Sequence, residues 1–222
     1  MFDCVFLMAG KGERSQLDIN KVYYKINNKP LFKYSLDVFL DIEECNKIVL
    51  VVREDEYNRV SHLSSSRIKI VYGGQMRQDS VASGVIATSE KIVLIHDAAR
   101  YNVSKDDIIQ VYLNTIDYQA AVLATKVTDT IKTVSDYKVV NTLDRNTLWA
   151  MQTPQGVKRD LYLDCLKKAR QENYYGTDDV ELLEKYANVK ARIVPGHHCN
   201  YKLTNAEDII VAEAILKEKN NV

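Results

Sequence analysis

The chain enters its first predicted strand and turn with Val5-Phe6-Leu7-Met8-Ala9-Gly10-Lys11-Gly12-Glu13-Arg14. Apolar side chains on successive residues are typical of a strand buried on both faces, as in a parallel sheet. Glycines directly after such a strand let backbone N–H groups approach a phosphate closely. The stretch therefore predicts an α/β fold whose first turn either cradles a phosphate or is an ordinary turn with solvated charges.

Further apolar runs predict strands at residues 48–52, 68–72, 92–95, 120–124 and 191–194. Amphipathic segments alternate with them, including a helix opened by Pro30. Capping boxes, Ser104 with Asp107 and Thr204 with Glu207, predict two later helix starts. Alternating strands and helices predict a three-layer Rossmann-like α/β fold with a mostly parallel central sheet, as a single domain over residues 1–222.

One stretch breaks this alternation. Residues 128–134 alternate polar and apolar side chains, Ser135-Asp136 suits a turn, and residues 138–143 read as a second strand. The pattern predicts an inserted β-hairpin with one solvated face. Such a hairpin is either a surface decoration or an arm, at about residues 128–147, that grips another subunit.

Composition narrows the partners and the compartment. Thirty basic residues balance thirty acidic ones, so no global field favours nucleic acid or an anionic membrane. No apolar run approaches the roughly 20 residues that cross a bilayer. The four cysteines are far apart and form no C-x-x-C pair, which is typical of reduced thiols. We expect a soluble cytoplasmic protein that binds neither nucleic acid nor membrane.

The glycine-rich turn does not match the common nucleotide motifs. Ser15 stands where the dinucleotide fingerprint needs its third glycine, and no G-K-[S/T] sequence closes a phosphate-binding P-loop. What remains is a turn with two nearby fixed cations, Arg14 and Lys21.

Two further clusters follow strand ends. After Gly73-Gly74, Ser80 lies near a predicted helix start, where its hydroxyl either caps the helix or binds a ligand. Asp97 and Arg100 follow the strand at 92–95, at the sheet edge where open α/β sheets bind ligands. At this place Asp97 can bind a divalent cation or a substrate hydroxyl. Alternatively, Arg100 forms a structural ion pair with Asp97.

Six segments in this order resemble the 4-diphosphocytidyl-2-C-methyl-D-erythritol synthase family, a family of nucleotidyltransferases. The resemblance rests on residues 8–14 with Lys21, residues 73–81, residues 96–100, residues 144–155, residues 177–179 and residues 200–204. It implies transfer of a cytidylyl group from CTP to 2-C-methyl-D-erythritol 4-phosphate, with release of pyrophosphate. It also implies Mg²⁺ and a homodimer joined through the hairpin arm.

The resemblance implies a role for each matched residue. Catalytic cations would be Arg14, Lys21 and Lys202. The nucleotide would meet Met8, Ala9, Gly10, Lys11, Gly12, Gly74, Ser80 and Ala98. The acceptor would meet Asp97, Arg100, Thr130, Arg145, Thr153 and Thr177, with Arg145 supplied by the partner subunit and Asp97 the candidate metal ligand.

The sequence departs from the family pattern at Met8, Asn20, Gln75 and Tyr101, which puts affinity more than activity in doubt. Two alternatives stay open. One is a cytidylyltransferase acting on ribitol 5-phosphate, and the other is a non-catalytic nucleotide-binding regulatory protein.

Overall fold

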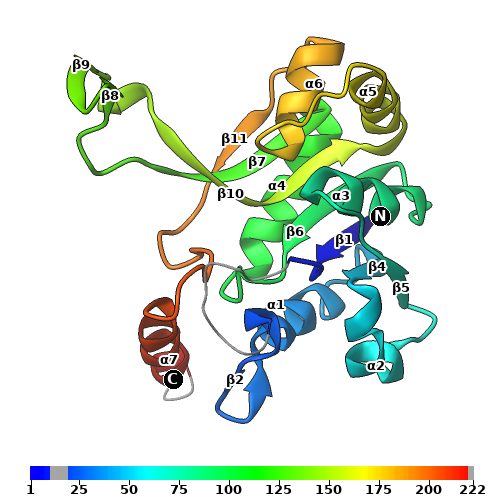
Figure 1. Cartoon of the computed structure of the whole chain (residues 1–222). Helices are drawn as coiled ribbons and strands as arrows, with labels where there is room; N and C mark the ends of the chain where they lie inside the picture. Colours follow the sequence, from blue (N-terminus) through cyan, green and yellow to red (C-terminus); the bar gives the residue numbers. More distant parts are fainter. Residues whose placement is uncertain (11–19, 220–222) are drawn as a thin grey trace.

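The computed structural model describes residues 1–10 and 20–219, which build a seven-stranded sheet in the order β11-β7-β10-β6-β1-β4-β5 (Figure 1). Its strands are β1 (Phe2–Leu7), β4 (Cys45–Val52), β5 (Ile68–Tyr72), β6 (Ile92–Asp97), β7 (Ala120–Lys126), β10 (Trp149–Lys158) and β11 (Arg192–Pro195). Six of them are parallel, and β10 runs antiparallel to both neighbours. All strands predicted from apolar runs are confirmed, with small shifts at their ends.

Helices cover both faces of this sheet, which confirms the three-layer α/β fold. One face packs against α1 (Leu31–Leu40), α2 (Tyr57–Val60) and α4 (Lys105–Tyr118). The other packs against α3 (Arg77–Ile86), α5 (Arg159–Gln171) and α6 (Asp179–Ala187). Because successive side chains of a strand point to opposite faces, Phe6 enters the first core and Val5 the second.

A third, smaller cluster packs α7 (Asp208–Lys219) against Ile26 of the short strand β2 (Lys25–Ile26) and Leu31 of α1. Strand β2 pairs with β3 (Lys29–Pro30). Tyr101, one of the departures from the family pattern, is buried there and packs edge-on against Tyr201, with ring centroids 6.1 Å apart. The 3-10 turns are η2 (Lys21–Tyr23), η3 (Glu54–Glu56), η4 (Ser61–Leu63) and η5 (Arg145–Thr147). Within the described part of the chain, no helix has the length and apolar character needed to cross a membrane.

One of the two predicted helix caps is confirmed. Ser104 caps α4, and its hydroxyl accepts a hydrogen bond from Asp107 N at 3.0 Å. The second is wrong in its partner, because α7 begins only at Asp208. The Asp208 carboxylate, rather than that of Glu207, accepts from the backbone N–H and the hydroxyl of Thr204.

The apolar runs of the sequence do not predict strand β10, which contains Pro154 and Gly156, two residues that are disfavoured in a central strand. The structure accommodates Pro154 where the pairing of β10 with β7 shifts register, between Met151 and Gln155. Gly156 is needed because α4 packs close: a Cβ there would lie 1.9 Å from the Thr115 hydroxyl oxygen. Tertiary packing thus overrides the local signal.

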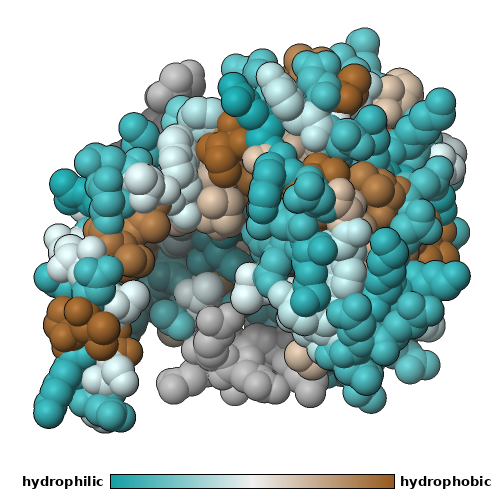
Figure 2. Space-filling view, turned by 90° about the horizontal axis from the view of Figure 1, so that it is seen from above, coloured by the Kyte–Doolittle hydropathy of each residue, from teal (hydrophilic) through white to brown (hydrophobic). Residues whose placement is uncertain are grey.

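The predicted hairpin exists as a separate two-stranded sheet, β8 (Lys132–Ser135) and β9 (Lys138–Thr142), with every residue exposed. Its turn is Asp136-Tyr137, one residue later than predicted, with φ of 47° and 59°. It projects from the body of the molecule (Figure 1). Figure 2 shows hydrophobic side chains on this projecting side, where Val134, Val139 and Val140 are each more than half exposed.

Candidate active site

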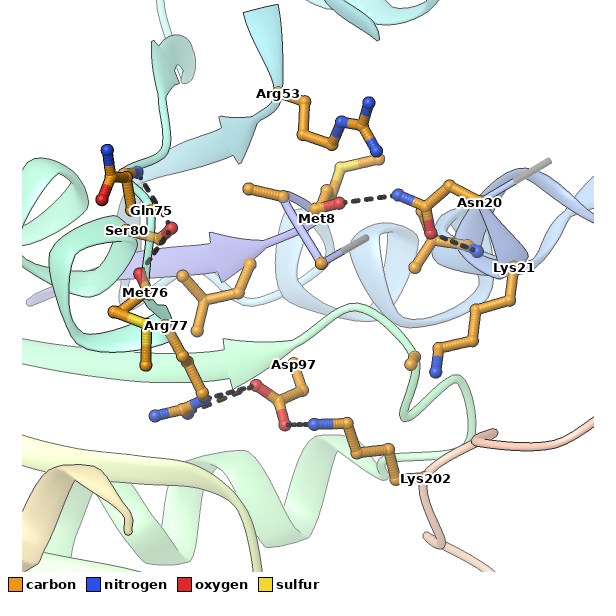
Figure 3. Close-up of a pocket in the computed structure, with 16 residues that line it drawn as sticks. Met8, Asn20, Lys21, Arg53, Gln75, Met76, Arg77, Ser80, Asp97 and Lys202 are labelled. Atoms are coloured by element: carbon orange, nitrogen blue, oxygen red, sulfur yellow. Dashed lines mark hydrogen bonds and ion pairs between the residues drawn. The ribbon is translucent and has the colours of Figure 1, made fainter. Parts of the chain in front are cut away.

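An open cleft of about 1080 Å³ lies at the carboxyl ends of β1 and β6 (Figure 3). From β1 the chain goes to β4 and β5 on one side and then to β6 on the other, and open α/β sheets bind ligands at such a switch in strand order. Four basic residues and one acidic residue are among the described residues of its lining, which favours an anionic ligand. The cleft is lined by eight of the predicted site residues: Met8, Ala9, Gly10, Lys21, Gly74, Ser80, Asp97 and Lys202.

The glycine pair after β5 lets this loop pass close to its neighbours. A Cβ on Gly73 would lie 2.6 Å from Ala9 Cβ, and one on Gly74 would lie 2.3 Å from Asp79 Cβ. The Ser80 hydroxyl accepts a hydrogen bond from Gly74 N at 3.1 Å and donates to Met76 O at 3.2 Å. Ser80 therefore does not cap α3. Asp79 takes that place, since its carboxylate accepts from Met76 N.

Asn20 joins three parts of the cleft wall. Its side-chain amide donates to Met8 O at 3.0 Å and to the Glu56 carboxylate at 3.2 Å, and its carbonyl oxygen caps η2, which begins at Lys21. Burial raises the pKa of the Glu56 carboxyl, and the hydrogen bond from Asn20 partly offsets this rise. Three hydrogen bonds thus fix Asn20 at the turn before Lys21.

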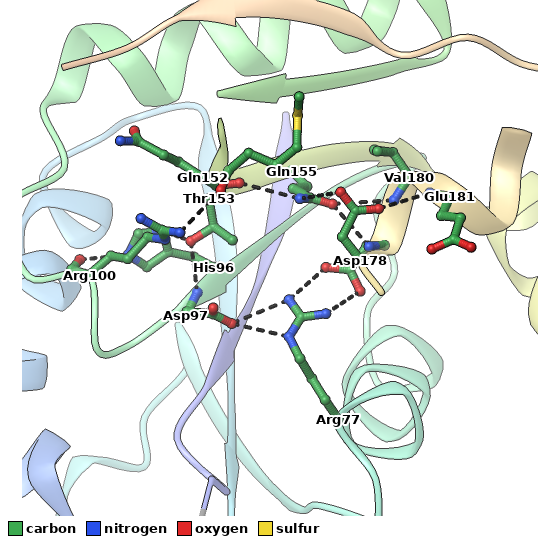
Figure 4. Close-up of polar contacts among 12 residues, drawn as sticks. Arg77, His96, Asp97, Arg100, Gln152, Thr153, Gln155, Asp178, Val180 and Glu181 are labelled. Atoms are coloured by element: carbon green, nitrogen blue, oxygen red, sulfur yellow. Dashed lines mark hydrogen bonds and ion pairs between the residues drawn. The ribbon is translucent and has the colours of Figure 1, made fainter. Parts of the chain in front are cut away.

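Asp97 ends β6 and is 8% exposed. Lys202 Nζ lies 2.7 Å from its Oδ2, and Arg77 Nη2 lies 3.3 Å from its Oδ1 (Figures 3 and 4). Burial alone would raise the pKa of Asp97, but Arg77 and Lys202 hold that pKa well below its usual range. Asp97 is therefore ionised at neutral pH.

Arg77 lies in residues 73–81, one of the segments that carry the family resemblance, but the resemblance implies no role for it. Its guanidinium also makes two hydrogen bonds of 2.8 Å to the carboxylate of Asp179, whose side chain is 2% exposed. The signal was a cation in the first turn of the helix that follows the glycine pair. The partner at Asp179 could not be inferred, because it lies 102 positions along the chain.

Thr153 and Arg100 hold the sheet edge together and do not line the cleft. Burial lowers the pKa of His96 to about 4, so its ring is neutral. A consistent hydrogen-bond order follows: Asp97 N–H donates to the Thr153 hydroxyl, which donates to His96 Nδ1, and His96 Nε2–H donates to Arg100 O. Arg100 donates to the carbonyls of Asn200 and Met151. In the structure of the single chain, these hydrogen bonds fix the backbone at Asp97.

The remaining predicted residues lie elsewhere. Thr130 and Arg145 belong to the exposed arm region, and Arg145 donates to Thr128 O. Thr177 is exposed beside α6 and binds the Glu181 carboxylate. Ala98 is buried. Lys11, Gly12 and Arg14 lie outside the described residues.

The metal-binding side chains at the cleft are too few to hold a Mg²⁺ ion by themselves. They are better suited to a Mg²⁺ ion that is already bound to phosphates. No group of three or more His, Cys, Asp or Glu side chains suited to a metal occurs among residues 1–10 and 20–219. Asp97 is the carboxylate among the described lining residues, and both its oxygens face cations. Mg²⁺ in proteins commonly takes one or two carboxylates and completes its shell with substrate phosphates and water.

Comparison with known proteins agrees with this geometry. Residues 3–218 match the family model described as 2-C-methyl-D-erythritol 4-phosphate cytidylyltransferase. Proteins of that name from Geobacillus kaustophilus and Clostridioides difficile are 38% and 37% identical, over 98% and 97% of this chain and 98% and 94% of theirs.

Solved structures are similar over the same length. The 4-diphosphocytidyl-2C-methyl-D-erythritol synthase of Anaerococcus prevotii superposes with a TM-score of 0.87 at 28% identity, covering 97% of this chain and 96% of that one. The 2-C-methyl-D-erythritol 4-phosphate cytidylyltransferase of Francisella tularensis superposes with a TM-score of 0.82 at 30% identity, covering 95% of this chain and 97% of that one. The chain belongs to the 2-C-methyl-D-erythritol 4-phosphate cytidylyltransferase family.

Proposed function

We propose that this protein transfers the cytidylyl group of CTP to 2-C-methyl-D-erythritol 4-phosphate, in non-mevalonate isoprenoid precursor synthesis. The observation that carries the proposal is the cleft, where Lys21 and Lys202 lie with Asp97 beside the glycine-rich turns in a chain of this family. The products are 4-diphosphocytidyl-2-C-methyl-D-erythritol and pyrophosphate.

The chemistry needs positioning more than covalent help. A phosphate oxygen of the acceptor attacks the α-phosphorus of CTP, a new P–O bond forms, and the bond to the β-phosphate breaks so that pyrophosphate leaves. Several negative charges meet in this step, and fixed cations that neutralise them lower the barrier. Lys21 and Lys202 would supply two of these cations in the cleft. The family resemblance implies Arg14 as a third, which lies outside the described residues.

Mg²⁺ would reach the cleft on the triphosphate and neutralise phosphate charge there. Asp97 is the side chain we propose to be nearest this ion or the acceptor hydroxyls. Because Lys202 holds one oxygen of Asp97, that contact has to be exchanged before Asp97 takes a ligand there.

The acceptor half of the site is proposed to be shared between two subunits. Thr177 lies at the N-terminal end of α6, while Thr130 and Arg145 lie in the arm region. The exposed valines of β8 and β9 support an arm that packs on a partner, because a hairpin cannot bury them by itself. We therefore propose a homodimer through the arm at about residues 128–147, with Arg145 meeting the acceptor phosphate of the other subunit.

A cytoplasmic location is part of the same proposal. The four cysteines are free thiols and three of them are buried, which supports a reducing compartment.

The test is pyrophosphate release with each of the four nucleoside triphosphates and with each of two acceptors. We expect turnover with CTP, Mg²⁺ and 2-C-methyl-D-erythritol 4-phosphate. A preference for ribitol 5-phosphate would replace the acceptor and keep the chemistry. Absence of turnover with either acceptor, in protein that binds CTP, would favour the non-catalytic alternative.

A further inference from the structure

The two cations on Asp97 are held in different ways. Lys202 contacts Oδ2 through one ammonium group at 2.7 Å. Arg77 contacts Oδ1 at 3.3 and 3.4 Å, while its two terminal nitrogens each lie 2.8 Å from an oxygen of Asp179. The paired geometry on Asp179 fixes the guanidinium plane, and no equivalent second carboxylate holds Lys202 among the described residues.

An arriving triphosphate competes with Asp97 for cations. Lysine is a compact charge on a flexible four-carbon stem, so Lys202 can turn from Asp97 to a phosphate. Arg77 cannot follow without breaking its paired contact with Asp179, which is buried and would lose its counter-ion. If both cations left, Asp97 would be a buried carboxylate without either of its ion-pair partners, which is strongly unfavourable.

We propose that Arg77 is a positioning residue: it stays on Asp97 (Figure 4), so that Lys202 is free to move to the triphosphate. Asp179 keeps Arg77 in place through its two hydrogen bonds. This inference rests on the proposed function, since it assumes a triphosphate in the cleft. It assigns different tasks to two cations that contact the same carboxylate. Lys202 is the exchangeable cation, and Arg77 is the fixed one.

The test is a double-mutant cycle of Arg77→Gln and Lys202→Ala, read out as the Kd for CTP by calorimetry and as kcat/KM for CTP. If Arg77 acts by freeing Lys202, Arg77→Gln should raise the Kd for CTP and lower kcat/KM by about tenfold or more in the native background. Once Lys202 is alanine, the same substitution should change each quantity by less than about twofold. Asp179→Asn should behave as Arg77→Gln does in the same cycle, and it answers the same question if Arg77→Gln does not fold.

Tyr162→Phe is the matched control, because it removes the phenol hydroxyl that donates to Asp179 at 3.3 Å and leaves Arg77 untouched. It should keep kcat/KM within about twofold of native, with thermal unfolding showing that each variant is folded. Independent losses from Arg77→Gln and Lys202→Ala, or an equal loss in Tyr162→Phe, would overturn the inference. Native protein that binds CTP but releases no pyrophosphate would instead overturn the proposed function, and the binding cycle would still test Arg77.

Discussion

Replacing Asn20 should cost stability in a way that depends on both the new side chain and the pH. In Asn20→Ala, the bond to the Met8 carbonyl is worth about 1 kcal/mol and the bond to the Glu56 carboxylate about 2 kcal/mol, so the loss is about 3 kcal/mol. The same substitution removes the cap from η2, where Lys21 lies, so kcat should fall as well.

In Asn20→Asp the new side chain has nearly the same shape as asparagine. It replaces the amide nitrogen, which lies 3.2 Å from a Glu56 carboxylate oxygen, by the oxygen of a second carboxylate. One of the two must bind a proton, which above the ordinary carboxyl pKa costs about 1.4 kcal/mol per pH unit. The pKa of Glu56 is already raised by burial, so the folded state holds a proton more tightly than the unfolded state does, and stability is lost as pH rises. The extra cost in Asn20→Asp should grow by up to about 4 kcal/mol between pH 5 and pH 8.

Urea unfolding of both variants at pH 5 and pH 8 measures these differences. Asn114→Ala is the control, because its amide makes an exposed hydrogen bond to Gln110 O and should change stability by less than about 0.5 kcal/mol. Equal losses in Asn20→Ala and Asn20→Asp, unchanged between the two pH values, would show that the amide does not donate to an ionised Glu56.

Three further predictions concern catalysis, packing and assembly. Lys21→Ala and Lys202→Ala should each lower kcat by a factor on the order of 100 in a pyrophosphate-release assay, and near-native values in both would place the cationic site elsewhere. Gly156→Ala should lower the free energy of unfolding by about 1–3 kcal/mol, because its Cβ would lie 1.9 Å from the Thr115 hydroxyl oxygen and 2.9 Å from Leu94 Cδ2. Adding Thr115→Ala should recover only part of this loss, because it removes the hydroxyl oxygen and leaves the contact with Leu94. Arg145→Ala should raise KM for the polyol phosphate and change KM for CTP little. Mixed dimers of one Arg145→Ala subunit and one Lys21→Ala subunit should regain activity, and no recovery would show that Arg145 serves its own subunit.

Local pattern predicted most of the fold, because strands buried on both faces leave continuous apolar runs and helix starts leave polar caps. Strand β10 could not be predicted, because the contacts that allow it to form are not local in sequence. Pro154 is tolerated by a shift in register against β7, and Gly156 by the close approach of α4. The hairpin was predicted because its alternation is local, but the role of its exposed valines depends on a second subunit.

The cleft residues were predictable where their place follows from position along one strand or turn. Asp97, Gly74 and Lys21 lie in the cleft because strand ends and glycine-rich turns meet at one edge of the sheet. Thr153 is 4% exposed and accepts a hydrogen bond from Asp97 N, which lies 56 positions away along the chain, and its contact with the acceptor stays a prediction. Contacts of this separation leave no pattern in a single sequence.

Charge type, rather than charge count, decides how Asp97 can work. In the sequence, Arg77 and Lys202 are two positive charges of equal sign and size, and their shared carboxylate becomes visible only in the structure. The structure separates them, because a planar guanidinium can pair with Asp179 through two bonds and still reach Asp97, whereas one ammonium on a flexible stem cannot hold both. Arg77→Lys is therefore not conservative at this site. It would leave one buried carboxylate without a fixed counter-ion and make both cations exchangeable, so that Asp97 would hold Lys202 more tightly when CTP arrives.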